Sequence, residues 1–159
     1  MNRETTVVVA EDDEAHASLI QRNLRRAGVS NPVTVFSDGR SVLDYLFRRG
    51  ERQRKPGAPH VLLLDIRMPG EDGVEVLRQV KSDAELKKLP IIMLTTTDDP
   101  REVARCHELG CNGYVTKPLD YSKFVEAIQR LSMFLSTAEI PKLDGVDQCE
   151  PLTAACATT

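Results

Sequence analysis

The chain has 159 residues, with 21 Lys or Arg against 24 Asp or Glu, and a formal net charge of −3 at pH 7. This length suits one domain with a short extension, and the mixed charges form no basic stripe, which argues against binding to nucleic acid. No apolar run approaches the roughly 20 residues that cross a bilayer, and the first residues form no signal peptide, so we expect a cytoplasmic protein without membrane contact.

Strand-like and helix-like segments alternate along the chain, a pattern typical of a parallel sheet with helices on both faces. Five short apolar runs are predicted to be strands, at 5–10, 31–36, 61–64, 91–94 and 113–116. We expect a helix after each strand, which gives a doubly wound α/β fold with a five-stranded parallel sheet.

The helices are predicted from apolar residues that recur at helical spacing, and their ends from capping residues. An acidic residue followed by proline, as in Asp99-Pro100, is a typical helix start. The predicted starts are Ser37 or Asp38, Gly73, Asp98-Asp99-Pro100 and Asp120, and the predicted ends are Gly28 and Gly110. The last helix is expected to bury one face, formed by Phe124, Ile128, Leu131 and Leu135.

Residues 1–137 are predicted to form the domain, and residues 138–159 a C-terminal tail. The stretch 48–59 is polar and is predicted to be a surface loop. The tail contains Pro141, Gly145 and Pro151 without a clear period, so we expect it to be disordered, with self-association as its candidate role.

The cysteines and histidines give no pattern for a zinc site, and a reducing cytosol favours free structural thiols. These residues are Cys106, Cys111, Cys149, Cys156, His16, His60 and His107. His16 is expected to lie near the acidic edge described next, because the first helix follows Glu11-Asp12.

Carboxylates follow two of the predicted strands. Asp65 ends the run 61–64, and Glu11 and Asp12 end the run 7–10. The carboxyl ends of parallel strands meet at one edge of a sheet, where sites of such folds lie. Three carboxylates about 4 to 5 Å apart repel by roughly 3 to 4 kcal/mol per pair at an effective dielectric constant near 20. The cluster therefore predicts a bound cation, and Mg²⁺, which prefers oxygen ligands, is the natural candidate.

Two more polar residues end strands at the same edge, Thr95 after the fourth strand and Lys117 after the fifth. A hydroxyl and an ammonium group can each donate to a phosphoryl oxygen. The set suits phosphoryl transfer onto a carboxylate, in which the protein mainly positions groups and an aspartate acts as the nucleophile.

Four separated motifs then carry a family resemblance. They are Val-Val-Val-Ala-Glu11-Asp12-Asp13, Leu-Leu-Leu-Asp65-Ile-Arg-Met-Pro69-Gly-Glu-Asp-Gly73, Met-Leu-Thr95-Thr, and Gly-Tyr114-Val-Thr-Lys117-Pro118. Over about residues 5–135 the chain resembles the receiver domain of two-component response regulators, of the stand-alone type seen in chemotaxis and phytochrome signalling. The resemblance implies the flavodoxin-like (βα)5 receiver fold.

The resemblance also implies roles for the acidic residues. Asp65 would be the phosphoacceptor and Asp12 a direct Mg²⁺ ligand. Glu11 would act mainly through metal-bound water, and the backbone carbonyl of Arg67 would complete the protein ligands. Asp12-Asp13 is the other reading of the acid pair, but the strand period and the family spacing favour Glu11-Asp12.

Thr95 and Tyr114 would form the switch of such a receiver, the hydroxyl moving toward the phosphate and the ring turning inward. Tyr114 is otherwise an ordinary strand aromatic with its hydroxyl in water. The Lys117-Pro118 peptide bond is expected to be cis, a rare geometry.

Three segments, at 48–59, 82–90 and 94–97, resemble the subgroup that serves phytochrome-type histidine kinases. The expected partners are such a kinase, docking near Ala15 and His16, and a downstream protein or histidine phosphotransfer protein. A homodimer is also expected, through the fourth helix, fifth strand and fifth helix or through the last helix and tail, because Met133-Phe134-Leu135 is apolar. Apart from its own phosphorylation and dephosphorylation, no enzyme activity is expected.

Three other classes of protein fit the sequence less well. A phosphohydrolase with an aspartyl phosphate would need an acid where Arg67 stands. A flavin protein of this topology would need a Ser/Thr/Gly-rich loop after the first strand. A degenerate receiver that acts only as a docking module is disfavoured by the complete set of Glu11, Asp12, Asp65, Thr95 and Lys117.

Overall fold

The computed structural model describes residues 1–143, which form a parallel sheet with helices on both faces. The strands are β1 (Thr6–Ala10), β2 (Val33–Phe36), β3 (His60–Leu64), β4 (Ile91–Thr95) and β5 (Gly113–Thr116). The helices are α1 (Glu14–Arg26), α2 (Gly39–Leu46), α3 (Gly73–Ser82), α4 (Pro100–Leu109) and α5 (Tyr121–Thr137), with a 3₁₀ turn, η1, at Leu86–Lys88.

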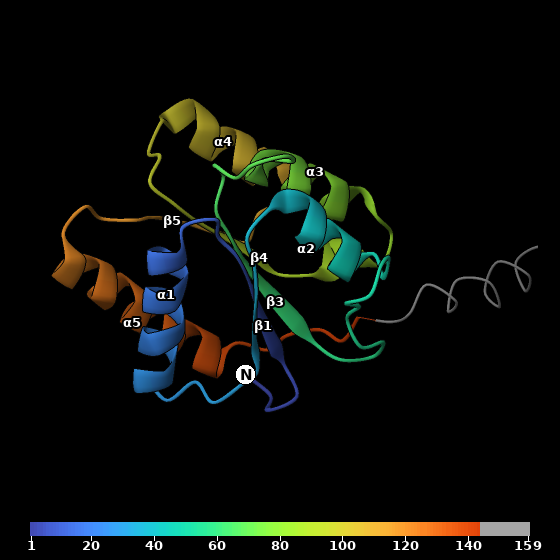
Figure 1. Ribbon diagram of the computed structural model, residues 1–159, viewed down its shortest axis with the longest axis horizontal. Coiled ribbons are helices and arrows are strands. Elements are labelled where there is room, and N and C mark those ends of the chain that lie inside the picture. The colour runs from blue at the N-terminus through green and yellow to red at the C-terminus, as the bar shows by residue number, and fades with distance from the viewer. Residues whose placement is uncertain (144–159) are drawn as a thin grey trace, which may run out of the picture.

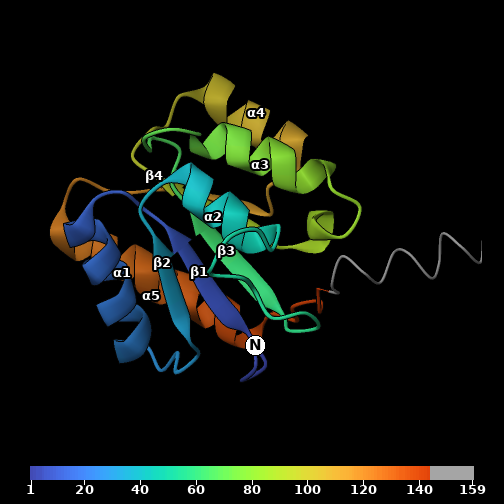
Figure 2. The same ribbon diagram turned by 45° about the vertical axis from the view of Figure 1, so that its right-hand side comes forward.

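The strand order is β2-β1-β3-β4-β5, and every neighbouring pair is parallel. Helices α1 and α5 pack together on one face, and α2, α3 and α4 cover the other (Figures 1 and 2). The strand that follows β1 in the chain, β2, lies on one side of it in the sheet, and the next strand, β3, lies on its other side. The ends of β1 and β3 therefore border the crevice in which such folds bind ligands, and the predicted doubly wound fold is confirmed.

Side chains of the central strands alternate between two apolar cores, as the two-residue period of a strand requires. Val8 and Leu62 face α2, α3 and α4, whereas Val7 and Leu63 face α1 and α5. All residues of β3 are buried, as expected for a strand that is covered on both faces. This burial explains why β3 reads as an unbroken apolar run until it meets the carboxylate of Asp65.

The helix starts agree with the capping residues in the sequence. The side chains of Asp38, Asp99 and Asp120 accept hydrogen bonds from the first backbone N–H groups of α2, α4 and α5. Gly110, with φ of 105°, ends α4 in a left-handed conformation. The turn η1 was not predicted from the sequence. Asp83 Oδ2 accepts from the backbone N–H groups of Glu85, just before the turn, and of Leu86, its first residue.

The loop 48–59 is not the simple surface loop that its polarity predicts. Arg54 is 2% exposed, and its Nε donates to the Leu46 carbonyl at 2.8 Å. Its Nη1 lies 3.4 Å from the Leu143 carbonyl oxygen, which also accepts from Gly57 N at 2.6 Å. Arg54 and the Gly57 N–H are therefore bonded to backbone carbonyls, one of which, that of Leu143, lies on the segment that follows α5.

The prediction of a disordered tail is wrong for residues 138–143. After α5 the chain, red in Figure 1, passes the start of β3. There Lys142 pairs with Pro59 in an antiparallel bridge. Leu143 is fully buried in the core that α2 and α3 cover. Burial of this apolar side chain holds the segment against the domain. The prediction of disorder rested on the Pro and Gly residues of the tail and did not consider Leu143.

Cys106 and Cys111 are buried free thiols, as predicted. Burial raises the pKa of Cys106 to about 11, so its thiol is protonated at neutral pH. Cys149 and Cys156 lie outside the described residues. Within residues 1–143, the helices are too short or too polar to span a bilayer.

Replacing Leu143 with alanine should lower the free energy of unfolding by about 2 to 5 kcal/mol, because it leaves a cavity in a packed core. Urea unfolding followed by circular dichroism measures this loss. The matched control is Leu119→Ala, at a side chain that is 99% exposed, and it should change the value by less than about 0.5 kcal/mol. Equal effects of the two substitutions would contradict the docking of Leu143.

Candidate functional site

The polar residues predicted at the strand ends lie together at the carboxyl edge of the sheet. Glu11 follows β1, Asp65 follows β3, Thr95 ends β4 and Lys117 follows β5. Backbone hydrogen bonds place them: Asp65 N donates to the Ala10 carbonyl at 3.0 Å, and Lys117 N donates to the Thr95 carbonyl at 2.6 Å. The strand register therefore brings together residues up to 106 positions apart.

Lys117 lies at the centre of the site, and only 3% of it is exposed. Its Nζ donates to Glu11 Oε1, to Asp65 Oδ2 at 3.2 Å and to His16 Nδ1 at 3.2 Å. Each hydrogen of the ammonium group thus has an acceptor. A buried lysine is tolerated only when its charge is paired in this way.

Glu11, Asp12 and Asp65 each offer a carboxylate oxygen, and these oxygens lie within 4.8 Å of one another. Glu11 and Asp65 are buried, whereas Asp12 is exposed. Asp65 Oδ1 is buried without a hydrogen-bond partner among the described residues. An unpartnered buried oxygen beside two other acids fits a hard divalent cation. Arg67 lies exposed in the loop after Asp65.

The two buried acids differ in how they hold a proton. Burial raises the pKa of Glu11 to about 7, and nearby Asp65 adds to this rise while Lys117 opposes it. Burial also acts to raise the pKa of Asp65, but the charge of Lys117 and hydrogen bonds outweigh it and leave that pKa below its ordinary value. Of the two carboxyls, Asp65 is the one that stays ionised at neutral pH.

Thr95 is fully buried at the end of β4. Its hydroxyl lies near enough to Asp65 to help lower the pKa of that carboxyl. Within residues 1–143, however, Thr95 Oγ1 makes no hydrogen bond of good distance and angle. The hydroxyl is thus beside the carboxylate with its bonding capacity unused.

The Tyr114 hydroxyl does not lie free in water. It donates to the Thr97 carbonyl at 2.8 Å, which links β5 to the loop after β4. Burial raises its pKa to about 12. Tyr114 thus touches the chain two residues beyond Thr95.

The predicted cis bond is wrong, because all peptide bonds among residues 1–143 are trans, Lys117-Pro118 included. The strand register alone brings Lys117 to the edge, and its long side chain reaches the acids from there.

Gly73 was predicted as a helix start and as the end of the Asp65 motif, but its contact with the site was not predicted from the sequence. A Cβ atom at this position would overlap the backbone carbonyl oxygen of Asp65. Its N–H donates to the Ile66 carbonyl at 2.7 Å, and Asp72 caps α3 directly before it. The first turn of α3 therefore packs against the backbone that carries the acid, and only glycine fits there.

Comparison with known proteins agrees with this geometry. Residues 7–129 match the response regulator receiver domain. The chain therefore belongs to the receiver domain family of two-component response regulators. Its five-stranded parallel sheet and its cluster of acids are consistent with that family.

Several members are similar over nearly the whole chain. The response regulator Rcp1 of Synechocystis sp. is 30% identical over 141 residues, which cover 88% of this chain and 95% of Rcp1. A receiver domain from Rhodospirillum rubrum is 43% identical, with a TM-score of 0.83 over 88% of this chain and 99% of that one. The phosphorylated cyanobacterial phytochrome response regulator RcpA is 32% identical, with a TM-score of 0.78 over 86% and 97%. An Mn²⁺-bound form of Rcp1 gives 29% identity and a TM-score of 0.79 over 86% and 98%.

Replacing Lys117 with methionine should destabilise the metal-free protein by about 3 kcal/mol at pH 8, because two buried carboxyls lose their cation. The pKa of Glu11, already raised by burial, then rises further, and the pKa of Asp65 rises above that of the unfolded chain. A carboxyl with a raised pKa contributes stability below its unfolded pKa, and this contribution is lost as the pH rises through the folded pKa. The loss should therefore shrink toward pH 5.

Urea unfolding in a chelator at both pH values measures the difference. Lys123→Met, at an exposed position on α5, is the matched control and should have little effect at either pH. A loss that is the same at pH 5 and pH 8 would show that the effect of Lys117 is packing rather than charge.

Proposed function

We propose that Asp65 accepts a phosphoryl group from the phosphohistidine of a sensor kinase. The observation that carries this proposal is the state of the Asp65 carboxylate. It is buried, its pKa is lowered, and one oxygen is unpartnered while the other accepts from Lys117. An ionised, positioned carboxylate is what a nucleophile for phosphorus requires.

We propose Mg²⁺ as the cofactor, held by Asp12, Asp65, the backbone carbonyl of Arg67 and, less directly, Glu11. The close carboxylate oxygens support this assignment, and the Mn²⁺-bound structure of the relative Rcp1 is in keeping with a divalent ion at such a site. The ion would neutralise negative charge on the acids and the phosphoryl oxygens.

The residues of the chain then have separate tasks. The Asp65 oxygen forms a bond to phosphorus as the bond from phosphorus to the donor nitrogen breaks. Lys117 Nζ, already at the carboxylate, donates to a phosphoryl oxygen. The unused hydroxyl of Thr95 donates to another. These donors offset the charge of about −1.5 to −2 that the phosphoryl group adds.

We propose that Thr95 and Tyr114 carry this event to the surface. If Thr95 moves toward the phosphoryl group, the loop that follows it must shift. That loop contains the Thr97 carbonyl to which Tyr114 is bonded. The Tyr114 ring is half-buried at the edge strand β5, so a change in this bond alters the surface formed by α4, β5 and α5.

A phytochrome-type histidine kinase is the partner that we propose for input. RcpA, a relative, is described as a phytochrome response regulator. The surface beside Lys117 is suited to a partner helix, with a hollow of about 410 Å³ lined by α1 and the start of α5. Leu119 is 99% exposed and Tyr121 is 59% exposed at its rim. Output would pass to a downstream protein or a histidine phosphotransfer protein, and the cytoplasmic location stays a prediction.

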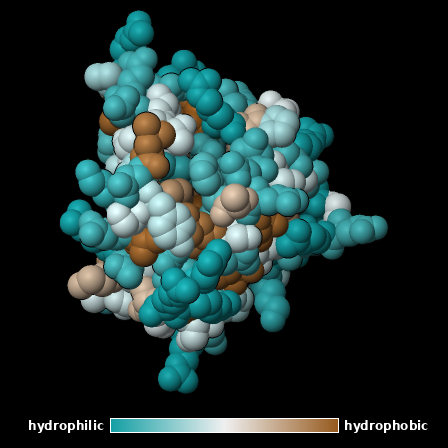
Figure 3. Space-filling view, turned by 60° about the vertical axis from the view of Figure 1, so that its left-hand side comes forward, coloured by the Kyte–Doolittle hydropathy of each residue, from teal (hydrophilic) through white to brown (hydrophobic). Residues whose placement is uncertain are grey.

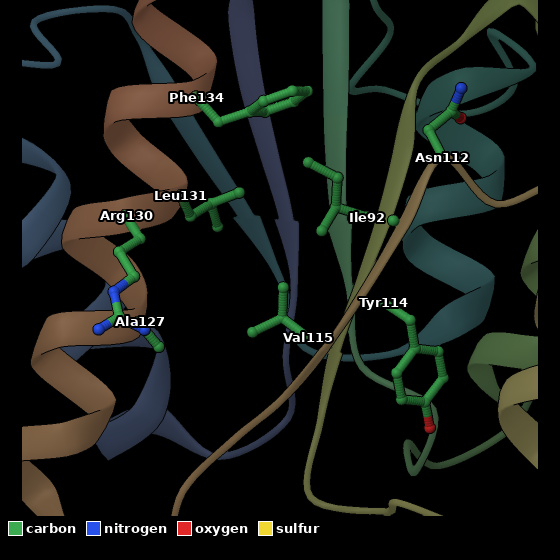
Figure 4. A pocket seen from close by; sticks show the side chains of 9 residues that line it. Ile92, Asn112, Tyr114, Val115, Ala127, Arg130, Leu131 and Phe134 are labelled. Carbon is green, nitrogen blue, oxygen red and sulfur yellow. The ribbon is translucent and has the colours of Figure 1, made fainter. Parts of the chain in front are cut away.

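A homodimer through β5 and α5 is the form of self-association that we propose. A groove of about 410 Å³ lies between these elements, with Val115, Leu131 and Phe134 on its apolar walls (Figure 4). Tyr114 points to the other side of β5. On the face in Figure 3, hydrophobic patches lie among hydrophilic side chains. Because β5 is also an edge strand, its outer backbone groups are available to a second copy.

Phosphorylation can be tested with a small acyl phosphate and intact-protein mass spectrometry. We expect the gain of one phosphoryl group, which requires Mg²⁺ and is lost in Asp65→Asn. Asp98→Asn, at an exposed aspartate that is not one of the clustered acids, is the matched control and should still be phosphorylated. A folded, Mg²⁺-binding protein that gains nothing from the acyl phosphate or from a phosphorylated kinase would instead be a docking module.

Self-association can be tested by sedimentation of the unaltered chain and of Phe134→Asp. The side chain of Phe134 is 59% exposed, and a carboxylate there would be buried without a partner in the proposed dimer. We expect dimers for the unaltered chain and monomers for the variant. Leu119→Asp, at another exposed apolar position, should remain dimeric. Monomers of the unaltered chain, phosphorylated or not, would end the proposal.

A further inference from the structure

His16 contacts the centre of the site although the mechanism above gives it no task. It lies in the first turn of α1, and its side chain is 35% exposed. Its Nδ1 is 3.2 Å from Lys117 Nζ. It is therefore the third acceptor of the lysine, and the one that is not a carboxylate.

The contact defines which form of the ring is present. An ammonium group has hydrogens to donate and no lone pair, so His16 Nδ1 must be the acceptor. The ring is then neutral and carries its proton on Nε2. Two carboxylate oxygens also face Nδ1, Glu11 Oε1 at 3.7 Å and Asp13 Oδ2 at 3.9 Å, but both are beyond hydrogen-bond distance.

The position of His16 is fixed without help from Lys117. Asp13 caps α1, and its Oδ1 accepts from Ala15 N at 2.9 Å and from His16 N at 3.2 Å. The imidazole also packs edge-on against Phe124 of α5, with ring centroids 5.6 Å apart and an interplanar angle of 67°. Two helices thus hold the ring, whereas Lys117 reaches it on a flexible stem of four carbons.

We propose that His16 is a positioning residue that aims the Lys117 ammonium group at Asp65 during phosphoryl transfer. By accepting one hydrogen, Nδ1 fixes the rotation of the group, so that the other two hydrogens point at the acid oxygens. The two carboxylates engage other ligands when the site is loaded. Because His16 is not one of the clustered acids, it can go on accepting a hydrogen bond from Lys117 in the loaded site. This inference rests on the function proposed for Asp65.

Two substitutions separate the acceptor from the bulk of the ring. In His16→Asn the amide oxygen is two bonds from Cβ, as Nδ1 is, and can accept from Lys117. His16→Leu has similar size but no acceptor. At saturating Mg²⁺ and acyl phosphate, we expect the leucine variant to be phosphorylated about tenfold more slowly, since misdirected donors lose orientation. The asparagine variant should restore most of the rate.

A second measurement needs neither metal nor phosphate. A double-mutant cycle of His16→Leu with Lys117→Met, from urea unfolding in a chelator, should give a coupling of about fivefold in the unfolding equilibrium constant. With His16→Asn in place of leucine, the cycle should give a coupling near onefold, because the asparagine oxygen still accepts from Lys117 and the contact is not removed.

The outcomes are distinct. Equal slowing by asparagine and leucine, or a coupling near onefold in the cycle with leucine, would overturn the positioning role and leave the function of Asp65 intact. An unaltered chain that accepts no phosphoryl group would overturn both proposals, even if the cycle detects the contact.

Discussion

The buried ammonium of Lys117 and its two carboxylates are the interaction on which the site depends. Removing such charges from water costs several kcal/mol per ion, and only close pairing offsets this cost. The pairing requires β1, β3 and β5 to end at the same level, because each supplies one partner. The parallel sheet with central β3 meets this requirement, and the apolar cores on its two faces hold that register.

The same cluster explains why the two buried acids differ in pKa. Glu11 and Asp65 share one lysine but differ in the balance of burial against charge, so a proton prefers Glu11. The Asp65 carboxylate therefore stays ionised at neutral pH. Gly73 has no side chain, so the start of α3 can pack directly against the Asp65 carbonyl. The ionised state of the Asp65 carboxylate is therefore set by packing and electrostatics within the protein itself.

Local signals in the sequence were enough for the strands, the helix caps and the acids at the strand ends. Asp38, Asp99 and Asp120 cap helices through bonds that span only two or three residues. The missed features depend on contacts between distant parts of the chain. Arg54 meets Leu143 across 89 residues. His16 was expected near the acidic edge, but its contact with Lys117, 101 residues away, was not predicted. Polarity and spacing carry no record of such pairings.

The docking of Leu143 has a consequence for biosynthesis. Its side chain enters the core beside α2 and α3, yet it is made after every strand and helix of the sheet. A nascent chain that has just completed α5 still exposes the apolar surface that Leu143 covers, and exposed apolar surface favours aggregation before folding is complete. During synthesis, the core can therefore be completed only after the segment beyond α5 has emerged from the ribosomal exit tunnel.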